Sequence, residues 1–472
     1  MSAKRGNTAT ASREITLLVP CFLAVLASLF SCTGRQEPAV PAPQLPDTLR
    51  VGTLYSPTSL FLFRGDTMGY EYERISSFAA DCGIELEFAI ARNMEAMIEM
   101  LDTGAIDIIA YEVPVTAEYN SRALHCGDES ITHQVLVQGR GKDRVTDVTQ
   151  LVGKEVWVEK GSKYESRLRN LDNEIGGGII IQTIEDSVIT EDLIDLVSRK
   201  KIQFTIVDSD IAQLNKTYYS GIDISMPVSF PQRSSWAVRP ADTWLADTIN
   251  AWCALAKSQD ENKRAMKRYF EISKREADGS GMEIYRPGSD PTLPRGAISA
   301  YDELFKKYSS GIGWDWRLLA SQAWVESKFD TTVTSWAGAR GLMQVMPGTA
   351  RAYGITPQEA VNPEKNIMVA CASIGDIMGY LAKRVPDAQE RVKFAVAAYN
   401  SGLGHVADAI ALAAKHGKDS AKWEGNVEDA LLWKSNPEYY NDEVCRCGYF
   451  RGRQTVVYVK KVMRQYDVFK KM

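Results

Sequence analysis

The chain has 472 residues, which is too long for one ordinary hydrophobic core, so we expect two domains with short additional segments. Its 45% hydrophobic and 24% charged residues are typical of a globular protein. The formal net charge of -5 offers no basic face for phosphate groups, and this argues against nucleic acid as a partner.

The N-terminus has the layout of an export signal. Cationic residues at positions 4, 5 and 13 precede a largely apolar run over 15–30, and small or polar residues follow. We therefore predict a signal peptide over residues 1–32. An uncleaved helical anchor is the alternative, although the run is short for a membrane span of about 20 residues.

Cys32 ends this segment within Leu29-Phe30-Ser31-Cys32, which resembles the lipobox of bacterial lipoproteins despite the bulk of Phe30. The resemblance implies that Cys32 is lipidated and becomes the first mature residue. Either interpretation leaves the rest of the chain outside the cytoplasm. A lipid anchor would tie it to a membrane at the periplasmic face of the cell envelope, and Thr33 in place of an inner-membrane-retaining Asp favours the outer membrane.

Six cysteines follow the predicted signal peptide, an even number in an oxidising compartment, so we expect some disulfides of unassigned connectivity. Cys445 and Cys447 are separated by a single residue, which is not metal-ligand spacing, and the four histidines are scattered. We predict neither a metal nor a cofactor. The six are Cys82, Cys126, Cys253, Cys371, Cys445 and Cys447.

Residues 33–46 contain four prolines and no apolar periodicity, which predicts an extended tether. Two βαβαβ units are expected over residues 47–271 and should form two α/β lobes with mainly parallel sheets. Strands are expected over 49–54, 84–90, 106–111, 155–158, 178–181, 203–207 and 235–238. Helices are expected over 70–81, 95–101, 164–171, 191–199, 245–256 and 263–270.

Three short segments of this region resemble the periplasmic solute-binding fold of the amino-acid-binding type, that is, the type II periplasmic binding proteins. They are Leu49-Arg50-Val51-Gly52-Thr53, Gly69-Tyr70-Glu71-Tyr72-Glu73 and Gly104-Ala105-Ile106-Asp107. The resemblance implies two lobes that close on a small ligand, such as a wall fragment or an amino-acid-like molecule.

That family usually holds the ligand carboxylate with an arginine close to a Thr-x-Glu-Arg stretch. Here the stretch reads Thr116-Ala117-Glu118-Tyr119-Asn120-Ser121-Arg122, so the arginine is displaced. Arg122 is therefore either a ligand contact or a solvated surface residue.

Glycines and prolines break the polar stretch over 272–295, which we interpret as a linker. The remainder, 296–472, has helical patterns without convincing strands and predicts an all-α domain.

Within a predicted helix over 317–326, Leu319, Ala323 and Glu326 fall on one apolar stripe. A glutamate there is costly unless it is paired or neutral, which makes it a candidate general acid. The alternative is a helix-end glutamate that reaches solvent or pairs with a neighbour.

Four motifs that begin at Glu326 occur in the order found in the soluble lytic transglycosylase family, which has a goose-type lysozyme-like fold. They are Glu326-Ser327 with Ser335, the run Gly338-Ala339-Arg340-Gly341-Leu342-Met343-Gln344-Val345-Met346-Pro347, Asn362-Pro363, and Ala397-Ala398-Tyr399-Asn400-Ser401-Gly402. Together with the N-terminal domain, the arrangement resembles a family of membrane-bound lytic transglycosylases. The implied partner is the glycan strand of peptidoglycan.

The resemblance implies that Glu326 first protonates the glycosidic oxygen between N-acetylmuramic acid and N-acetylglucosamine. As a carboxylate it then takes a proton from the muramic 6-hydroxyl, which closes a 1,6-anhydro ring without water. Asp330 is the obvious second carboxylate, but we expect it to mark the helix exit. A lysozyme-like hydrolase and a ligand-binding protein with an idle helical domain are the alternatives. We also expect the N-terminal clamp to regulate access to the cleft.

The resemblance assigns further substrate-binding positions. Ser335 would position the acetamido group, Met343 and Gln344 would line the cleft, and Tyr399 and Asn400 would stand beside Glu326. The structural alternatives are a polar loop residue for Ser335 and buried core residues for Met343 and Tyr399.

The last motif of the family is Glu-Thr followed by an aromatic residue. Here Tyr458 matches the aromatic position, and Gln454 replaces the glutamate. An uncharged amide cannot supply the field of a carboxylate, so we expect this exchange to affect rate more than reaction type.

Overall fold

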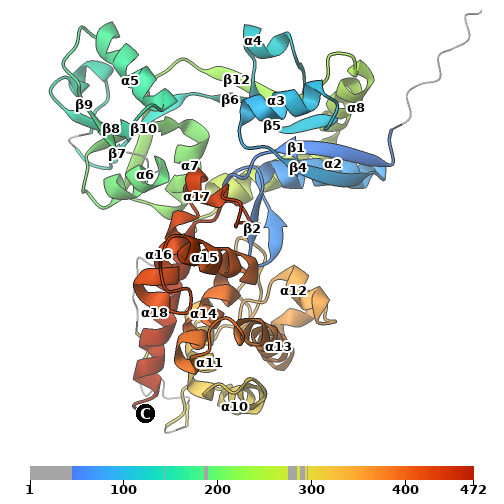
Figure 1. Ribbon diagram of the computed structural model, residues 1–472, viewed down its shortest axis with the longest axis vertical. Coiled ribbons are helices and arrows are strands. Elements are labelled where there is room, and N and C mark those ends of the chain that lie inside the picture. The colour runs from blue at the N-terminus through green and yellow to red at the C-terminus, as the bar shows by residue number, and fades with distance from the viewer. Residues whose placement is uncertain (1–44, 143, 185–189, 275–283, 287–292, 295) are drawn as a thin grey trace, which may run out of the picture. The chain divides into compact units, whose positions relative to one another are not determined.

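The computed structural model describes residues 45–472 except 143, 185–189, 275–283, 287–292 and 295. The predicted signal peptide, Cys32 and most of the predicted tether lie outside the described residues. From Leu45 to Met472 the chain forms one unit, in which an α/β part precedes a helical part (Figure 1).

The first βαβαβ unit forms where the sequence predicts it. In the first lobe, β1 (Thr48–Thr53) pairs in parallel with β4 (Glu85–Ile90) and β5 (Ile108–Pro114). The helices α2 (Tyr70–Cys82) and α3 (Met94–Asp102) connect these strands and cover them. Buried side chains from the strands and from α2 form the core, among them Leu49, Val51, Ile75 and Phe78.

The second lobe repeats this plan. Its parallel strands are β8 (Glu155–Glu159), β9 (Ile180–Ile184) and β10 (Phe204–Asp208). The helices are α5 (Lys163–Glu174) and α6 (Thr190–Ser198). Both sheets therefore place the carboxyl ends of several strands at one edge, as α/β folds do.

The sheets are mixed, whereas the sequence predicted mainly parallel ones. The first sheet has the order β4-β1-β5-β12-β6, and the second has the order β11-β7-β10-β8-β9. The antiparallel members are β6 (Leu124–Thr132), β7 (Gln134–Gly139), β11 (Ile222–Pro227) and β12 (Gln232–Val238). Several elements were not predicted from the sequence: β6, whose segment is polar and contains a glycine, β7, β11 and the helix α7 (Ser209–Tyr218).

The chain passes between the lobes at β6–β7 and again at β11–β12, because each pair divides its strands between the two sheets. Three helices close the α/β part: α8 (Thr243–Cys253), α9 (Ala256–Met266) and η2 (Lys267–Glu271).

A hairpin that the sequence analysis missed follows β1. Its strands are β2 (Phe61–Phe63) and β3 (Asp66–Met68), which pair antiparallel (Figure 1). Arg64 and Gly65 make the turn with φ of 53° and 87°, the left-handed pair that tight hairpins use. Its three-residue strands are too short to give a clear alternating pattern.

Residues 302–469 are helical, as predicted. The main helices are α10 (Asp302–Ser309), α11 (Trp316–Ser327), α12 (Pro347–Ala352), α13 (Pro363–Leu381), α14 (Ala388–Ser401), α15 (Leu403–Lys415), α16 (Glu428–Trp433), α17 (Pro437–Tyr440) and α18 (Gly452–Phe469). Their buried faces share one large apolar core. Within the described part of the chain, no helix combines the length and apolarity needed to cross a bilayer.

The six cysteines of the described chain are free thiols, so the expected disulfides do not form in this structure. Cys126 and Cys253 are buried in the core of the first lobe, and Cys371 is buried in the helical core. There they behave as small apolar side chains, which explains their placement without a bond.

Candidate active site

Glu326 lies in the last turn of α11, on the apolar stripe that the sequence indicates. Leu319 and Ala323 on the same stripe are fully buried, and the Glu326 side chain is only 4% exposed. A helix cap fixes the other end of α11, where the Asp315 carboxylate accepts a hydrogen bond from the Arg317 N–H. The carboxyl group of Glu326 is therefore held inside the protein by the helix itself.

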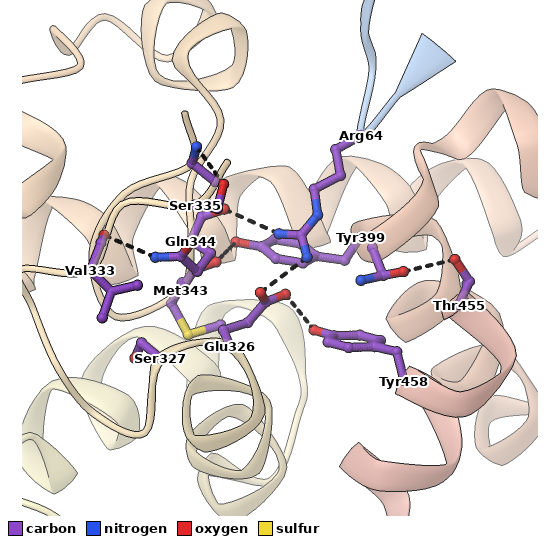
Figure 2. A network of polar contacts seen from close by, with 12 residues as sticks. Arg64, Glu326, Ser327, Val333, Ser335, Met343, Gln344, Tyr399, Thr455 and Tyr458 are labelled. Atoms are coloured by element: carbon purple, nitrogen blue, oxygen red, sulfur yellow. Dashed lines mark hydrogen bonds and ion pairs between the residues drawn. The ribbon is translucent and has the colours of Figure 1, made fainter. Parts of the chain in front are cut away.

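Each oxygen of the Glu326 carboxylate has one partner (Figure 2). Tyr458 Oη donates to Oε1 at 2.7 Å, and Arg64 Nη2 donates to Oε2 at 3.1 Å. The phenol of Tyr458 and the guanidinium of Arg64 thus offset the free-energy cost of burying the carboxylate. The structure therefore shows Glu326 as buried and paired, and not as a helix-end glutamate that reaches solvent.

Tyr399 and Tyr458 approach from α14 and α18. Burial and the nearby Glu326 carboxylate raise the pKa of both phenols, so both stay protonated and act as donors. Tyr399 Oη donates to the Met343 carbonyl at 2.8 Å and not to Glu326. Asn400 Oδ1 accepts a hydrogen bond from Thr455 Oγ1 at 2.7 Å, which ties α14 to α18.

The loop after α11 is anchored to the helix end by Ser327. Its hydroxyl donates to the Leu342 carbonyl at 2.8 Å. Ser335 accepts from the Ala339 N–H at 3.0 Å and so braces a turn of the same loop. The structure therefore places Ser335 in the loop near Glu326, with its hydroxyl oxygen already serving as an acceptor.

The side chains of Gln344 and Met343 are buried in this structure. The amide of Gln344 donates to the carbonyls of Val333 and Gly341 at 3.1 and 3.0 Å. Met343 is fully buried in the helical core. Neither side chain is open to a sugar ring here, in contrast to the cleft-lining positions that the resemblance implied.

Asn366 of α13 holds the other side of this loop. It accepts from the Met343 N–H at 2.7 Å and donates to the carbonyls of Arg340 and Ala360 at 2.9 and 2.6 Å. Gly341 has a φ of 76°, and a Cβ there would meet the Ala360 oxygen at 2.6 Å. The close approach and the positive φ explain why this motif position is a glycine.

Arg64 reaches the site from the β2–β3 hairpin of the α/β part (Figure 2). Besides Glu326, its guanidinium donates to the Gln344 carbonyl at 3.3 Å, and its backbone N–H donates to the Ser401 carbonyl at 3.1 Å. Its side chain is 12% exposed. Arg64 therefore occupies the space beside the Glu326 carboxyl group.

Further contacts fix the hairpin against the motif loops. Asp66 accepts from the Gly348 N–H at 3.2 Å, and His405 Nε2 lies 3.0 Å from the Leu62 carbonyl oxygen. The Phe63 ring lies 5.4 Å from that of Trp336. Arg64 was not predicted from the sequence, because its local pattern is only an Arg-Gly turn between two short runs.

The carboxylate oxygens of Glu326 bond to Tyr458 and Arg64, not to Gln454 or Asp330. Gln454 lines a small cavity of about 40 Å³ together with Phe63 and Tyr218. Asp330 is exposed beyond the end of α11, and hydrogen bonds from Thr332 lower its pKa. Asp330 thus has the helix-exit position that the sequence analysis expected.

Comparison with known families agrees with this architecture. Residues 303–422 match the family model described as the Transglycosylase SLT domain, and residues 49–272 match that of Bacterial extracellular solute-binding proteins, family 3. Fold and site together define a lytic transglycosylase that carries an N-terminal solute-binding-like domain.

Relatives of the whole chain narrow this class. A protein of Pseudomonas fluorescens (strain Pf0-1) named membrane-bound lytic murein transglycosylase F is 31% identical over 425 residues, which are 89% of this chain and 84% of the relative. A protein of the same name from Desulfosudis oleivorans is 30% identical and covers 87% of each chain. The chain belongs to the membrane-bound lytic murein transglycosylase F family.

Among solved structures, the L-cystine solute receptor of Neisseria gonorrhoeae in its unliganded open conformation is similar with a TM-score of 0.41 and 18% identity. The match covers 48% of this chain and 93% of the receptor.

Proposed function

We propose that the chain cleaves peptidoglycan between N-acetylmuramic acid and N-acetylglucosamine, with Glu326 as its single catalytic acid and base. The observation that carries the proposal is the Glu326 carboxylate, which is 4% exposed and held by Tyr458 Oη at 2.7 Å among the ordered motif loops. A fixed, buried carboxyl group is suited to protonate a leaving-group oxygen.

The reaction needs one proton that is given and then recovered. Protonated Glu326 donates its proton to the glycosidic oxygen, and the bond to the anomeric carbon breaks through an oxocarbenium-like state. The resulting carboxylate accepts the proton of the muramic 6-hydroxyl, whose oxygen bonds to the anomeric carbon. Glu326 is regenerated as an acid, and no water is consumed. Tyr458 would hold the carboxyl group in position through both steps.

The structure corresponds to a resting state of this enzyme. Arg64 Nη2 engages one oxygen of the Glu326 carboxyl group at 3.1 Å, which keeps that oxygen from a substrate. Because Arg64 belongs to the α/β part, the β2–β3 hairpin has to withdraw before a glycan strand can bind. We infer that movement of the solute-binding lobes controls this withdrawal, which assigns the N-terminal domain a regulatory role.

Product analysis tests the reaction. Purified sacculi are digested with the full chain and with the Glu326→Gln variant, and the soluble fragments are weighed by mass spectrometry. We expect anhydromuramic ends from the native chain and loss of release in the variant. Reducing ends, heavier by one water, would show a lysozyme-like hydrolase. Undiminished release by a folded Glu326→Gln chain would contradict the assignment of Glu326.

The remaining substrate contacts are part of the same proposal. We propose that Ser335 and Asn400 contact bound sugar once the hairpin has moved. Met343 and Gln344 would contact it only after a rearrangement, because Met343 is buried in the core and the Gln344 amide is bonded within the loop.

We propose that the chain is a lipoprotein attached through Cys32 to the outer membrane, with its lytic part facing peptidoglycan. The lipobox-like sequence supports this, and the relatives named above are described as membrane-bound. Metabolic labelling with a fatty acid should mark the native chain and not a Cys32→Ala variant. Membrane fractionation then separates inner from outer membrane.

A further inference from the structure

A large cavity lies between the two lobes of the α/β part. Its volume is about 530 Å³, which is enough for a small organic molecule. The first lobe contributes Glu71, Glu112 and Trp236 to its lining, and the second lobe contributes Ser209, Asp210 and Gln213. A ligand in this cavity would therefore contact both lobes at once.

The lining is strongly acidic. Its carboxylates are Glu71, Glu112, Asp128, Glu129 and Asp210, whereas the one basic side chain in the lining is Arg74. Tyr70, Trp236 and Phe270 add aromatic walls. Carboxylates next to aromatic faces form an environment that favours a cation.

The guanidinium of Arg74 is bound by other residues of the first lobe. Its Nη2 donates to Asp128 at 2.7 Å, and its Nη1 donates to the Ser258 carbonyl at 3.0 Å. Its guanidinium also lies over the ring of Trp252, 4.6 Å from the centroid, and its side chain is 3% exposed. Arg74 therefore has no free face for a ligand carboxylate.

Arg122 does not replace it. Its guanidinium is bound to Glu95 at 2.7 Å and to Asp102 at 2.6 Å on the surface of the first lobe, and it is not part of the cavity lining. The structure thus favours the surface interpretation of the displaced arginine.

The amino end of α7, which also borders the cavity, is already occupied by acidic groups. Asp208 is its N-cap residue, and Asp210 stands in its first turn. The positive end of a helix can hold a ligand anion, but here the Asp210 carboxyl group already accepts a hydrogen bond from the Ile211 backbone N–H.

Three of the carboxyl groups are poorly neutralised. Burial raises the pKa of Glu71, Glu112 and Asp210 to about 7 in each case. The groups also act on one another, because Glu71 further raises the pKa of Glu112, and Glu112 further raises that of Asp210. Nearby Lys163 lowers the pKa of Glu112 and of Asp210 only in part, because it is bound to Asp208 at 2.5 Å. The nearby cations, Arg74 and Lys163, are thus each paired with an aspartate and offset the charge of these three carboxyl groups only in part.

We propose that this cavity binds a small organic cation with two amino groups, of the diamine class, and does not require a carboxylate on its ligand. One amino group would pair with only one of the three carboxyl groups. A second amino group would leave one of them, and not two, without a cationic partner. Because Glu71 and Glu112 belong to the first lobe and Asp210 to the second, a dication between them replaces repulsion across the cavity by attraction. Ligand binding would then favour lobe closure.

An ordinary zwitterionic amino acid fits less well. Its α-carboxylate would enter a space lined by carboxylates with no unengaged cation, and leaving a charge unpaired there is costly. Lysine, with a net charge of one, should be intermediate. The order diamine, lysine, alanine is thus a direct consequence of the charges in the lining.

Calorimetric titration of the detergent-solubilised full chain tests the proposal without using lytic activity, so its outcome does not depend on the reaction proposed for Glu326. The probes are 1,4-diaminobutane, lysine, alanine, glutamate and calcium chloride, each up to about 5 mM. We expect 1,4-diaminobutane to bind most tightly and alanine and glutamate not to bind.

Two charge-neutralising variants distinguish the cavity from general surface attraction. Asp210→Asn removes a carboxylate from the lining and should weaken diamine binding about tenfold. Glu99→Gln removes one from an exposed position of the same α/β part and should leave binding unchanged. Thermal melting checks that both variants are folded.

Several results would overturn the proposal. These are tighter binding of alanine or glutamate than of the diamine, binding of calcium without the diamine, equal diamine binding by Asp210→Asn, and no heat from the diamine at the highest concentration. Loss of diamine binding in an Arg122→Ala variant would also overturn it, since that residue lies outside the cavity.

Discussion

Arg64 and Glu326 form a buried ion pair although 262 residues separate them in the sequence. Their side chains are 12% and 4% exposed, and the nitrogen–oxygen distance is 3.1 Å. The pair joins a hairpin of the solute-binding part to the candidate catalytic residue of the lytic part. One contact can therefore link the solute-binding part to the candidate catalytic residue and close the site.

Replacing Arg64 by alanine should raise the basal rate of peptidoglycan cleavage. The variant loses the ion pair and the bond to the Gln344 carbonyl, so the withdrawn position of the hairpin becomes more populated. A coupling of typical size predicts an increase of about fivefold or more. Release of soluble fragments from labelled sacculi measures it. Arg122→Ala removes a surface arginine of the same α/β part and serves as control, and an unchanged rate in a folded Arg64→Ala chain would refute autoinhibition by this contact.

Tyr458→Phe and Tyr399→Phe separate the roles of the two phenols. Tyr458 bonds to the Glu326 carboxylate, and such a charged hydrogen bond contributes about 1.5–3 kcal/mol. Tyr399 bonds to a neutral carbonyl, which contributes about 1 kcal/mol. We expect Tyr458→Phe to lower kcat about tenfold or more and Tyr399→Phe to act mainly on stability. Equal losses of kcat in two stably folded variants would contradict this division.

Asn366→Ala should strongly destabilise the lytic part. The amide makes two hydrogen bonds to the motif loop and one to the Ala360 carbonyl, and it is fully buried, so its loss leaves polar backbone groups without partners. We expect a loss of about 2–4 kcal/mol in the free energy of unfolding. Asn362→Ala removes only an N-cap bond to Lys365 and should cost about 1 kcal/mol. Urea unfolding followed by circular dichroism compares the two, and similar midpoints would contradict the bracing role.

Glu71→Gln should change the pH dependence of stability. The folded pKa of Glu71 is about 7, above the ordinary value, so its favourable contribution is present at low pH and is lost as pH rises through 7. The neutral variant keeps an acceptor for Trp236 and avoids this loss. Its melting temperature relative to the parent should therefore be higher at about pH 8 than at about pH 5, without added amines. Taking the difference cancels titrating groups that do not interact with Glu71, and Glu99→Gln should show no such trend.

The sequence by itself determined the parts of the fold that depend on neighbouring residues. The helical repeat already placed Glu326 with Leu319 and Ala323, and alternating runs predicted both βαβαβ units, because side-chain periodicity follows from backbone geometry. The order of the motifs likewise identified the lytic part. The sequence did not reveal the polar strand β6, whose pairing is set by its neighbours in the sheet.

The tertiary structure alone decided what surrounds Glu326. Nothing near Arg64 in the sequence indicates a contact with residue 326, since that contact depends on how the hairpin packs on the lytic part. The same holds for Gln344, whose amide is used inside its loop, and for the buried cysteines that remain free. Local periodicity fixes which face of a helix a residue occupies. Which distant group lies opposite that face is set by packing between segments far apart in the chain.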